Sequence, residues 1–191
     1  MRKENFLEKI YKYYPLIYEE SGSNKVKMRK SKTDQKIMYK DALITRIIAI
    51  AKGYEVVDWT DDEACCYEFK ILLHKDTPLL DDDKMLIKSL NGKRNDLRIF
   101  ISVLEPYYYM FIEKTLYFEL EDKWEFTTEE NNISEYEKLK EEIVSYLCKN
   151  GYIGLSPSDV LLPVPKVETT YKEVDNVTVF DCLFTDLVDI T

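Results

Sequence analysis

The stretch LRIFISVLEPYYYMFIEKTLYFELEDKWEFTT, residues 97–128, decides the fold. It is dense in Ile, Val, Phe, Tyr and Trp, the residue types that are enriched in β-strands. Turn residues interrupt the stretch at Glu105-Pro106 and at Asp122-Lys123. We therefore predict an antiparallel β-meander over these residues.

Two more strands are predicted immediately before the meander, over residues 54–59 and 64–74. The acidic sequence Thr60-Asp61-Asp62-Glu63 separates them and has the composition of a solvated turn. The two strands are expected to extend the sheet.

Helices are predicted on both sides of the strand block. Apolar residues recur at helical spacing near the N-terminus, and longer helices are expected over residues 31–52 and 134–149, the first as the central buried helix. Short helices are expected at 81–90 and at 156–157. The apolar run at residues 177–184 is predicted to be a buried strand.

Helices and strands that come in blocks favour an α+β fold, here an antiparallel sheet packed against several helices. The whole chain, residues 1–191, is long enough for one domain. Within it, residues 1–30 are expected to form a helix and a basic hairpin at the edge of that domain.

The charge of the chain is divided unequally along its length. Residues 1–52 contain 13 Lys and Arg against 6 Asp and Glu, a net charge of +7. Residues 53–191 contain 14 against 30, a net charge of −16, so the whole chain carries −9. Such an asymmetry bears on partners and association rather than on the fold.

Composition excludes several classes of function. With five glycines the chain contains neither of the glycine-rich phosphate-binding motifs. One histidine and four scattered cysteines predict no metal site and no cofactor. No window approaches the roughly 18 apolar residues of a membrane span, and the N-terminus is not a secretory signal, so a cytoplasmic protein without membrane association is expected.

The sharpest enzymatic pattern combines Asp58 with Glu68 and Lys70. Nucleases of the PD-(D/E)xK class place an Asp on one strand and Glu-x-Lys on the next, where the two carboxylates hold Mg²⁺ and the lysine activates water. The alternative interpretation is that Glu68 and Lys70 are surface residues on one face of a strand. The acidic body of the chain also disfavours nucleic acid as a ligand.

The remaining titratable residues have simpler explanations. His74 is expected to be a solvated residue at a strand end. The basic stretch from Lys25 to Lys36 suggests a phosphate-binding adaptor as a third class of function, but the residues between its charges are not aromatic, which favours an edge strand.

Acidic and aromatic residues are the candidates for a binding surface. The acidic candidates are Asp61, Asp62 and Glu63 in the predicted turn. The aromatic candidates are Tyr107, Tyr109 and Tyr117 on the strands, because tyrosine on the open face of a sheet is a natural interface anchor.

Two segments carry a resemblance: Val177-Thr178-Val179-Phe180-Asp181-Cys182-Leu183-Phe184-Thr185-Asp186 and Tyr13-Tyr14-Pro15. With its size, acidity and tyrosine-rich strands, the chain resembles small cytosolic immunity proteins of bacterial polymorphic toxin systems. The resemblance implies a non-catalytic protein that binds and blocks one cognate toxin. An acidic inhibitor suits this role, because it is steered to the basic cleft of a nucleic-acid-directed toxin. Homo-oligomerisation stays open.

Overall fold

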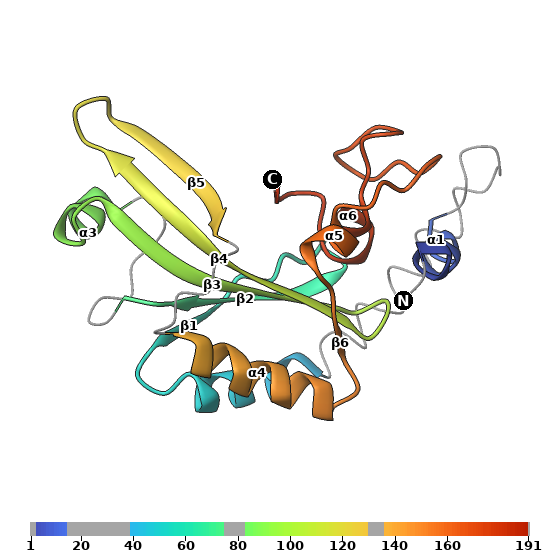
Figure 1. Cartoon of the computed structure of the whole chain (residues 1–191), viewed down its shortest axis with the longest axis horizontal. Coiled ribbons are helices and arrows are strands. Elements are labelled where there is room, and N and C mark those ends of the chain that lie inside the picture. The colour runs from blue at the N-terminus through green and yellow to red at the C-terminus, as the bar shows by residue number, and fades with distance from the viewer. Residues whose placement is uncertain (1–2, 15–38, 75–82, 130–135, 191) are drawn as a thin grey trace.

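A computed structural model describes residues 3–14, 39–74, 83–129 and 136–190. Within these ranges the chain forms a six-stranded sheet with helices on both of its faces, an α+β fold (Figure 1). The α+β prediction is confirmed. The predicted basic hairpin over residues 16–30 and the predicted helix start at Ser31 lie outside the described residues.

Five strands follow one another across the sheet in sequence order, each antiparallel to the next. They are β1 (Glu55–Asp58), β2 (Cys66–Leu72), β3 (Lys93–Ser102), β4 (Tyr107–Phe118) and β5 (Lys123–Glu129). The short β6 (Ile153–Gly154) pairs with β4 in the parallel direction. The predicted meander is therefore confirmed, with its turns at 103–106 and 119–122.

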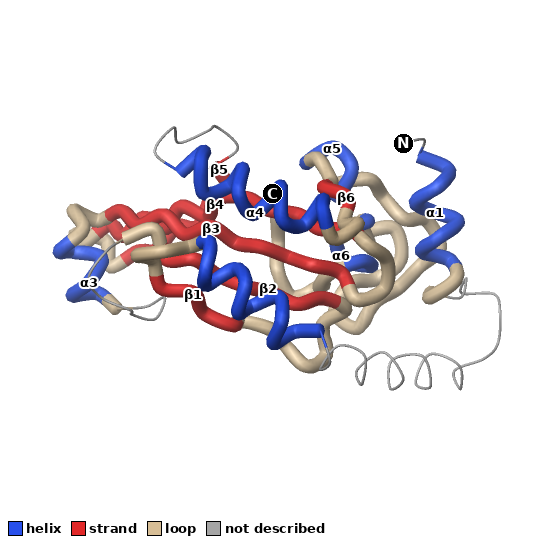
Figure 2. The backbone as a smooth tube through the Cα atoms, turned by 90° about the horizontal axis from the view of Figure 1, so that it is seen from below, coloured by secondary structure: helices blue, strands red, loops and turns tan. Residues whose placement is uncertain are grey.

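Two helices cover one face of this sheet, which we call the helix face. They are the helix at residues 39–50 and α4 (Glu137–Lys149), and Figure 2 shows both lying over the strands. Their apolar stripes pack on the odd-numbered residues of β2 and β3 to form one core. Its central members are Leu43, Ile47, Phe69, Ile71, Ile99, Ile143 and Leu147.

The helix at residues 39–50 is not the central buried helix that was expected. Leu43, Ile47 and Ala51 are buried at a spacing of four residues, whereas Ile48 is exposed. One side therefore packs on the sheet and the other faces solvent, which is the ordinary arrangement of an amphipathic surface helix.

A second core lies on the opposite face, at one end of the sheet. There α1 (Lys3–Tyr11), α5 (Pro157–Val160) and α6 (Val179–Leu183) gather (Figure 1). The core they build with the sheet is rich in aromatic rings. The rings in contact are Phe6, Phe100, Tyr107, Tyr109, Phe111, Phe180 and Phe184.

The predicted buried strand at residues 177–184 is wrong, because α6 occupies its centre. Thr178 begins this helix with a capping box: its hydroxyl accepts from the backbone N–H of Asp181, and the Asp181 carboxylate accepts from the N–H of Thr178 at 2.7 Å. All five residues of α6 are buried. A helix that is buried on every side has the same continuous apolar run as a buried strand.

The remaining helix, α3 (Lys84–Ser89), directly precedes β3 in the chain. Asp83 caps it by accepting from the N–H groups of Met85 and Leu86. This placement confirms the predicted short helix before the meander, and its predicted start at residue 81 lies outside the described residues.

Candidate functional site

Six charged side chains lie together on the side of the sheet opposite the helix face. We call the part of the sheet that they occupy the charged face. Side chains alternate between the two faces of a strand, so the register brings together residues of even number on β2 and β3 and of odd number on β4. None exposes more than 9% of its surface. They are Glu68, Lys70, Arg94, Asp96, Arg98 and Glu113.

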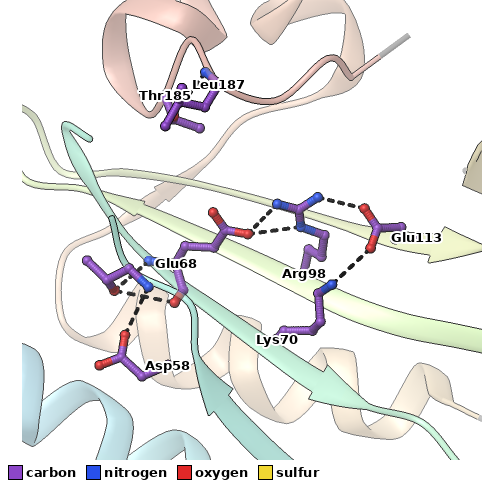
Figure 3. Close-up of polar contacts among 8 residues, drawn as sticks. Asp58, Glu68, Lys70, Arg98, Glu113, Thr185 and Leu187 are labelled. Carbon is purple, nitrogen blue, oxygen red and sulfur yellow. Dashed lines mark hydrogen bonds and ion pairs between the residues drawn. The ribbon is translucent and has the colours of Figure 1, made fainter. Parts of the chain in front are cut away.

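Four of these residues form a continuous chain of ion pairs (Figure 3). Arg98 Nε donates to Glu68 Oε1 at 3.0 Å, and Arg98 Nη1 donates to Glu113 Oε1 at 2.6 Å. Lys70 Nζ lies 3.2 Å from the other oxygen of Glu113. Two positive and two negative groups are thus matched, which is the condition under which buried ions persist.

Arg94 and Asp96 extend the charged face beyond this chain of ion pairs. Arg94 Nε donates to Asp96 Oδ2 at 2.8 Å, and both side chains are almost completely buried. Burial raises the pKa of Asp96 to about 6, although Arg94 and Lys70 favour its ionised form. Desolvation thus outweighs attraction here.

Glu68 and Arg98 respond to burial in different ways. Burial raises the pKa of Glu68, and the Arg98 guanidinium only partly opposes it. For Arg98 itself burial works against the charge, but Glu68 and Glu113 outweigh it and raise its pKa. Arg98, with a carboxylate on each side, is the centre of the network.

Some buried polar atoms at the edge of the charged face have no hydrogen-bond partner among the described residues. They are Asp96 Oδ1, Thr115 Oγ1 and both ring nitrogens of His74. His74 is therefore half-buried rather than a solvated residue, and burial lowers its pKa. A buried water or a small polar molecule would satisfy such groups.

The three residues of the predicted nuclease site do not converge. Asp58 is paired with Phe69 in the sheet register, so its side chain belongs to the helix face, whereas Glu68 and Lys70 belong to the charged face. Asp58 Oδ2 instead lies 2.5 Å from Lys40 Nζ. Figure 3 shows the Asp58 carboxylate directed away from that of Glu68. The structure therefore does not form the predicted two-carboxylate Mg²⁺ site.

The three tyrosines predicted as interface anchors are core residues. Tyr107 and Tyr109 are buried under α1 and α6, where they contact Phe6 and Phe180, and Tyr117 is covered by the ring of Trp124. Their predicted exposure is wrong: segments distant in sequence cover Tyr107 and Tyr109, and the neighbouring strand β5 covers Tyr117. Lys9 Nζ donates to the Tyr107 hydroxyl at 2.8 Å.

The acidic turn, Asp61-Asp62-Glu63, is exposed as the sequence predicted. Asp61 Oδ1 accepts from the N–H of Glu63 at 2.6 Å, which fixes the turn locally. Trp59 lies two residues before it and exposes 39% of its surface. The Lys70 ammonium lies 5.0 Å from the centroid of the Trp59 ring, a cation–π contact that holds the ring in place.

Trp59 is a surface aromatic residue that the sequence analysis did not name. The signal was present, because an exposed strand end beside an acidic turn is a suitable position for an anchor. The sequence analysis chose the tyrosines of the strands as candidate anchors instead.

Within the described ranges, no cluster of three or more His, Cys, Asp or Glu side chains could hold a metal ion. The described helices also include none long and apolar enough to cross a membrane.

Comparison with known proteins gives no match: no family model, no curated protein and no solved structure is similar to this chain.

Proposed function

We propose that this chain is a cytoplasmic, non-catalytic binding protein of the immunity type, which recognises and blocks a basic cognate toxin. The observation that carries the proposal is the position of the acidic turn beside Trp59. Three exposed carboxylates and one partly exposed, fixed indole ring form a compact surface at the end of β1.

The chemistry of this surface suits a positively charged partner. Carboxylates steer a basic protein during diffusion and select against acidic ones, which gives rate and specificity. A tryptophan that is already held in place loses little conformational entropy on binding and is among the residues that dominate interface energies. The net charge of −9 adds a long-range attraction toward a positively charged partner.

The charged face supports a structural role rather than catalysis. Its acids and bases are paired with one another in a continuous chain of buried ion pairs. Charges buried in this way stabilise a specific arrangement of strands when every partner is present.

The proposal is tested with the product of the neighbouring gene. We expect that product to be toxic when expressed alone and harmless when this chain is coexpressed. Replacing the turn by Asp61→Asn, Asp62→Asn and Glu63→Gln should weaken binding and slow association, and the slowing should diminish as salt is added.

A matched control is available on α4, where Glu137, Glu141 and Glu142 are also exposed. Changing all three to Gln alters the net charge equally, and binding should be weakened much less. Equal losses for the two triple variants would show that only net charge matters. A non-toxic neighbour, or toxicity that persists on coexpression, would contradict the proposal.

A further inference from the structure

The β3–β4 turn, the C-terminus of α4 and the segment before β6 meet at one end of the sheet (Figure 1). Residues from these segments line a pocket of about 320 Å³. This volume is within the range of ligand-binding pockets in proteins. We call it the tyrosine pocket, because three tyrosines line it: Tyr39, Tyr67 and Tyr152.

The three phenol rings come from three different elements. Tyr39 begins the described part of the helix at residues 39–50 and exposes 60% of its surface, whereas Tyr67 on β2 is buried. Tyr152 follows α4. Burial raises the pKa of both Tyr67 and Tyr152, and the neighbouring phenols contribute in the same direction.

The rest of the lining adds acceptors. Glu105, Ser102 and Asn150 supply polar side chains, and among the described residues that line the pocket none carries a positive charge. Faces of aromatic rings together with a carboxylate at the edge are the groups that bind guanidinium and ammonium ions in proteins.

Two lysines close to lining residues, Lys9 and Lys40, are already paired with carboxylates. Lys9 Nζ lies 3.2 Å from Glu105 Oε2 and donates to the Tyr107 hydroxyl, and the Tyr13 hydroxyl donates to Glu105 Oε1. Lys40 is paired with Asp58. These contacts fix the Glu105 carboxylate at the rim while each of its oxygens keeps a further lone pair.

The pocket is next to the acidic turn along the chain. Tyr67 follows Glu63 by four residues, and the connecting backbone is tied to the pocket wall because the Val103 N–H donates to the Cys65 carbonyl at 3.0 Å. A short stretch of backbone, anchored by this hydrogen bond, thus connects the acidic turn to the pocket wall.

We propose that the tyrosine pocket receives one positively charged side chain, an arginine or a lysine, of a protein partner. The identity of that partner as a basic toxin rests on the proposed function. The acidic turn attracts the partner, and the pocket then encloses the cationic group between the rings of Tyr39 and Tyr152.

The pocket is tested first without any partner, with a capped arginine, N-acetyl-arginine-N-methylamide, and its neutral isostere, the capped citrulline. In NMR spectra of the ¹⁵N-labelled full chain, the arginine compound should shift amide signals of residues 102–105 and 152 in a saturable way, and the citrulline compound should not. Absence of saturable shifts, or equal shifts with citrulline, would overturn the proposal.

Two variants locate the binding site. Tyr39→Ala and Tyr152→Leu should each weaken binding of the capped arginine by roughly threefold or more, the size of a cation–π contact. Tyr171 is the matched control for Tyr39, because it also exposes 60% of its surface but is not among the lining residues. Tyr171→Ala should leave the titration unchanged, and equal weakening by Tyr171→Ala would contradict the assignment.

A second arm distinguishes a partner's side chain from a free small cation. The Tyr39→Ala, Tyr152→Leu double variant should lose at least tenfold in affinity for the toxin of the coexpression test. If the capped arginine binds but the double variant holds the toxin as tightly as the unaltered chain, the pocket takes only small cations and the inference is overturned, while the proposed function stands. If the capped arginine binds and no toxin is blocked, the proposed function fails instead.

Discussion

The two faces of the central sheet are buried to a similar degree by opposite chemistry. On the helix face, Phe69, Ile71 and Ile99 pack against aliphatic side chains of two helices. On the charged face, the intervening residues Glu68, Lys70 and Arg98 are buried as ions. Burial alone therefore does not distinguish a hydrophobic core from an ionic one.

The same strands therefore carry apolar packing on one side and paired ions on the other, and the two kinds of contact differ in how much each depends on its neighbours. Apolar packing is non-directional, so one lost contact leaves the others in place. A buried ion depends on its partners, because desolvation costs several kcal/mol per ion when the opposite charge is removed. A single substitution should therefore lower the free energy of unfolding more on the charged face than on the helix face.

The largest effect is expected from Arg98→Met, which leaves the Glu68 and Glu113 carboxylates without their shared cation. We expect a loss of about 3–5 kcal/mol in the free energy of unfolding, measured by urea denaturation. The double variant Glu68→Gln, Arg98→Met retains the pairing of Glu113 with Lys70 and should recover most of that loss.

The exposed Arg46 is the control for this experiment, since Arg46→Met removes the same group from the surface and should change the free energy by less than about 0.5 kcal/mol. A loss below about 1 kcal/mol for Arg98→Met would contradict the expectation that the charged face is more sensitive to a single substitution than the helix face.

A smaller effect is expected on the helix face from Ile47→Ala. Ile47 is completely buried, and its truncation should cost about 3 kcal/mol through lost transfer energy and the cavity that remains. The adjacent Ile48 exposes half of its surface, so Ile48→Ala should cost less than about 0.5 kcal/mol. Equal costs at both positions would contradict the described orientation of this helix.

The smallest effect concerns pH. Burial raises the pKa of Asp96 from 3.8 to about 6, so the folded chain holds this proton more tightly than the unfolded chain does. The contribution of Asp96 to stability is therefore greatest at low pH and is lost as the pH rises through about 6. Between pH 5 and pH 7.5 the loss should be roughly 1.4 kcal/mol.

The variant Asp96→Asn isolates this contribution. The other titratable groups are common to the variant and the unaltered chain, so the pH dependence of the difference in their unfolding free energies reports on Asp96. The helix-face variant Ile47→Ala should show no such change. A difference that stays constant from pH 5 to pH 7.5 would contradict the raised pKa.

The strand order was predictable from sequence, and the arrangement of the charges was not. Dense β-branched and aromatic residues between Pro106 and Asp122 mark a strand with turns at both ends, and neighbouring strands in a meander pair in order. The position of Asp58 relative to Glu68 depends on the register, and a shift of one residue moves a side chain to the other face.

Long-range packing explains the other differences. Tyr107 and Tyr109 have the composition of surface anchors, but residues of α1 and α6 cover them, and no local pattern indicates such distant contacts. The helix α6 could have been found, because Thr178 and Asp181 have the spacing of a capping box. It was not predicted, because a continuous apolar run is also typical of a buried strand.

The aromatic core has a consequence for synthesis of the chain on the ribosome. Tyr14 donates its hydroxyl hydrogen to the carbonyl of Cys182, a contact that spans 168 residues, and Phe180 and Phe184 complete the same core. The buried residues of the helix-face core end at Leu147, and the last residue that packs against them is Tyr152. During translation one side of the sheet can thus close while the other still waits for α6, and its unfinished aromatic surface is the part of the nascent chain that most needs protection from aggregation.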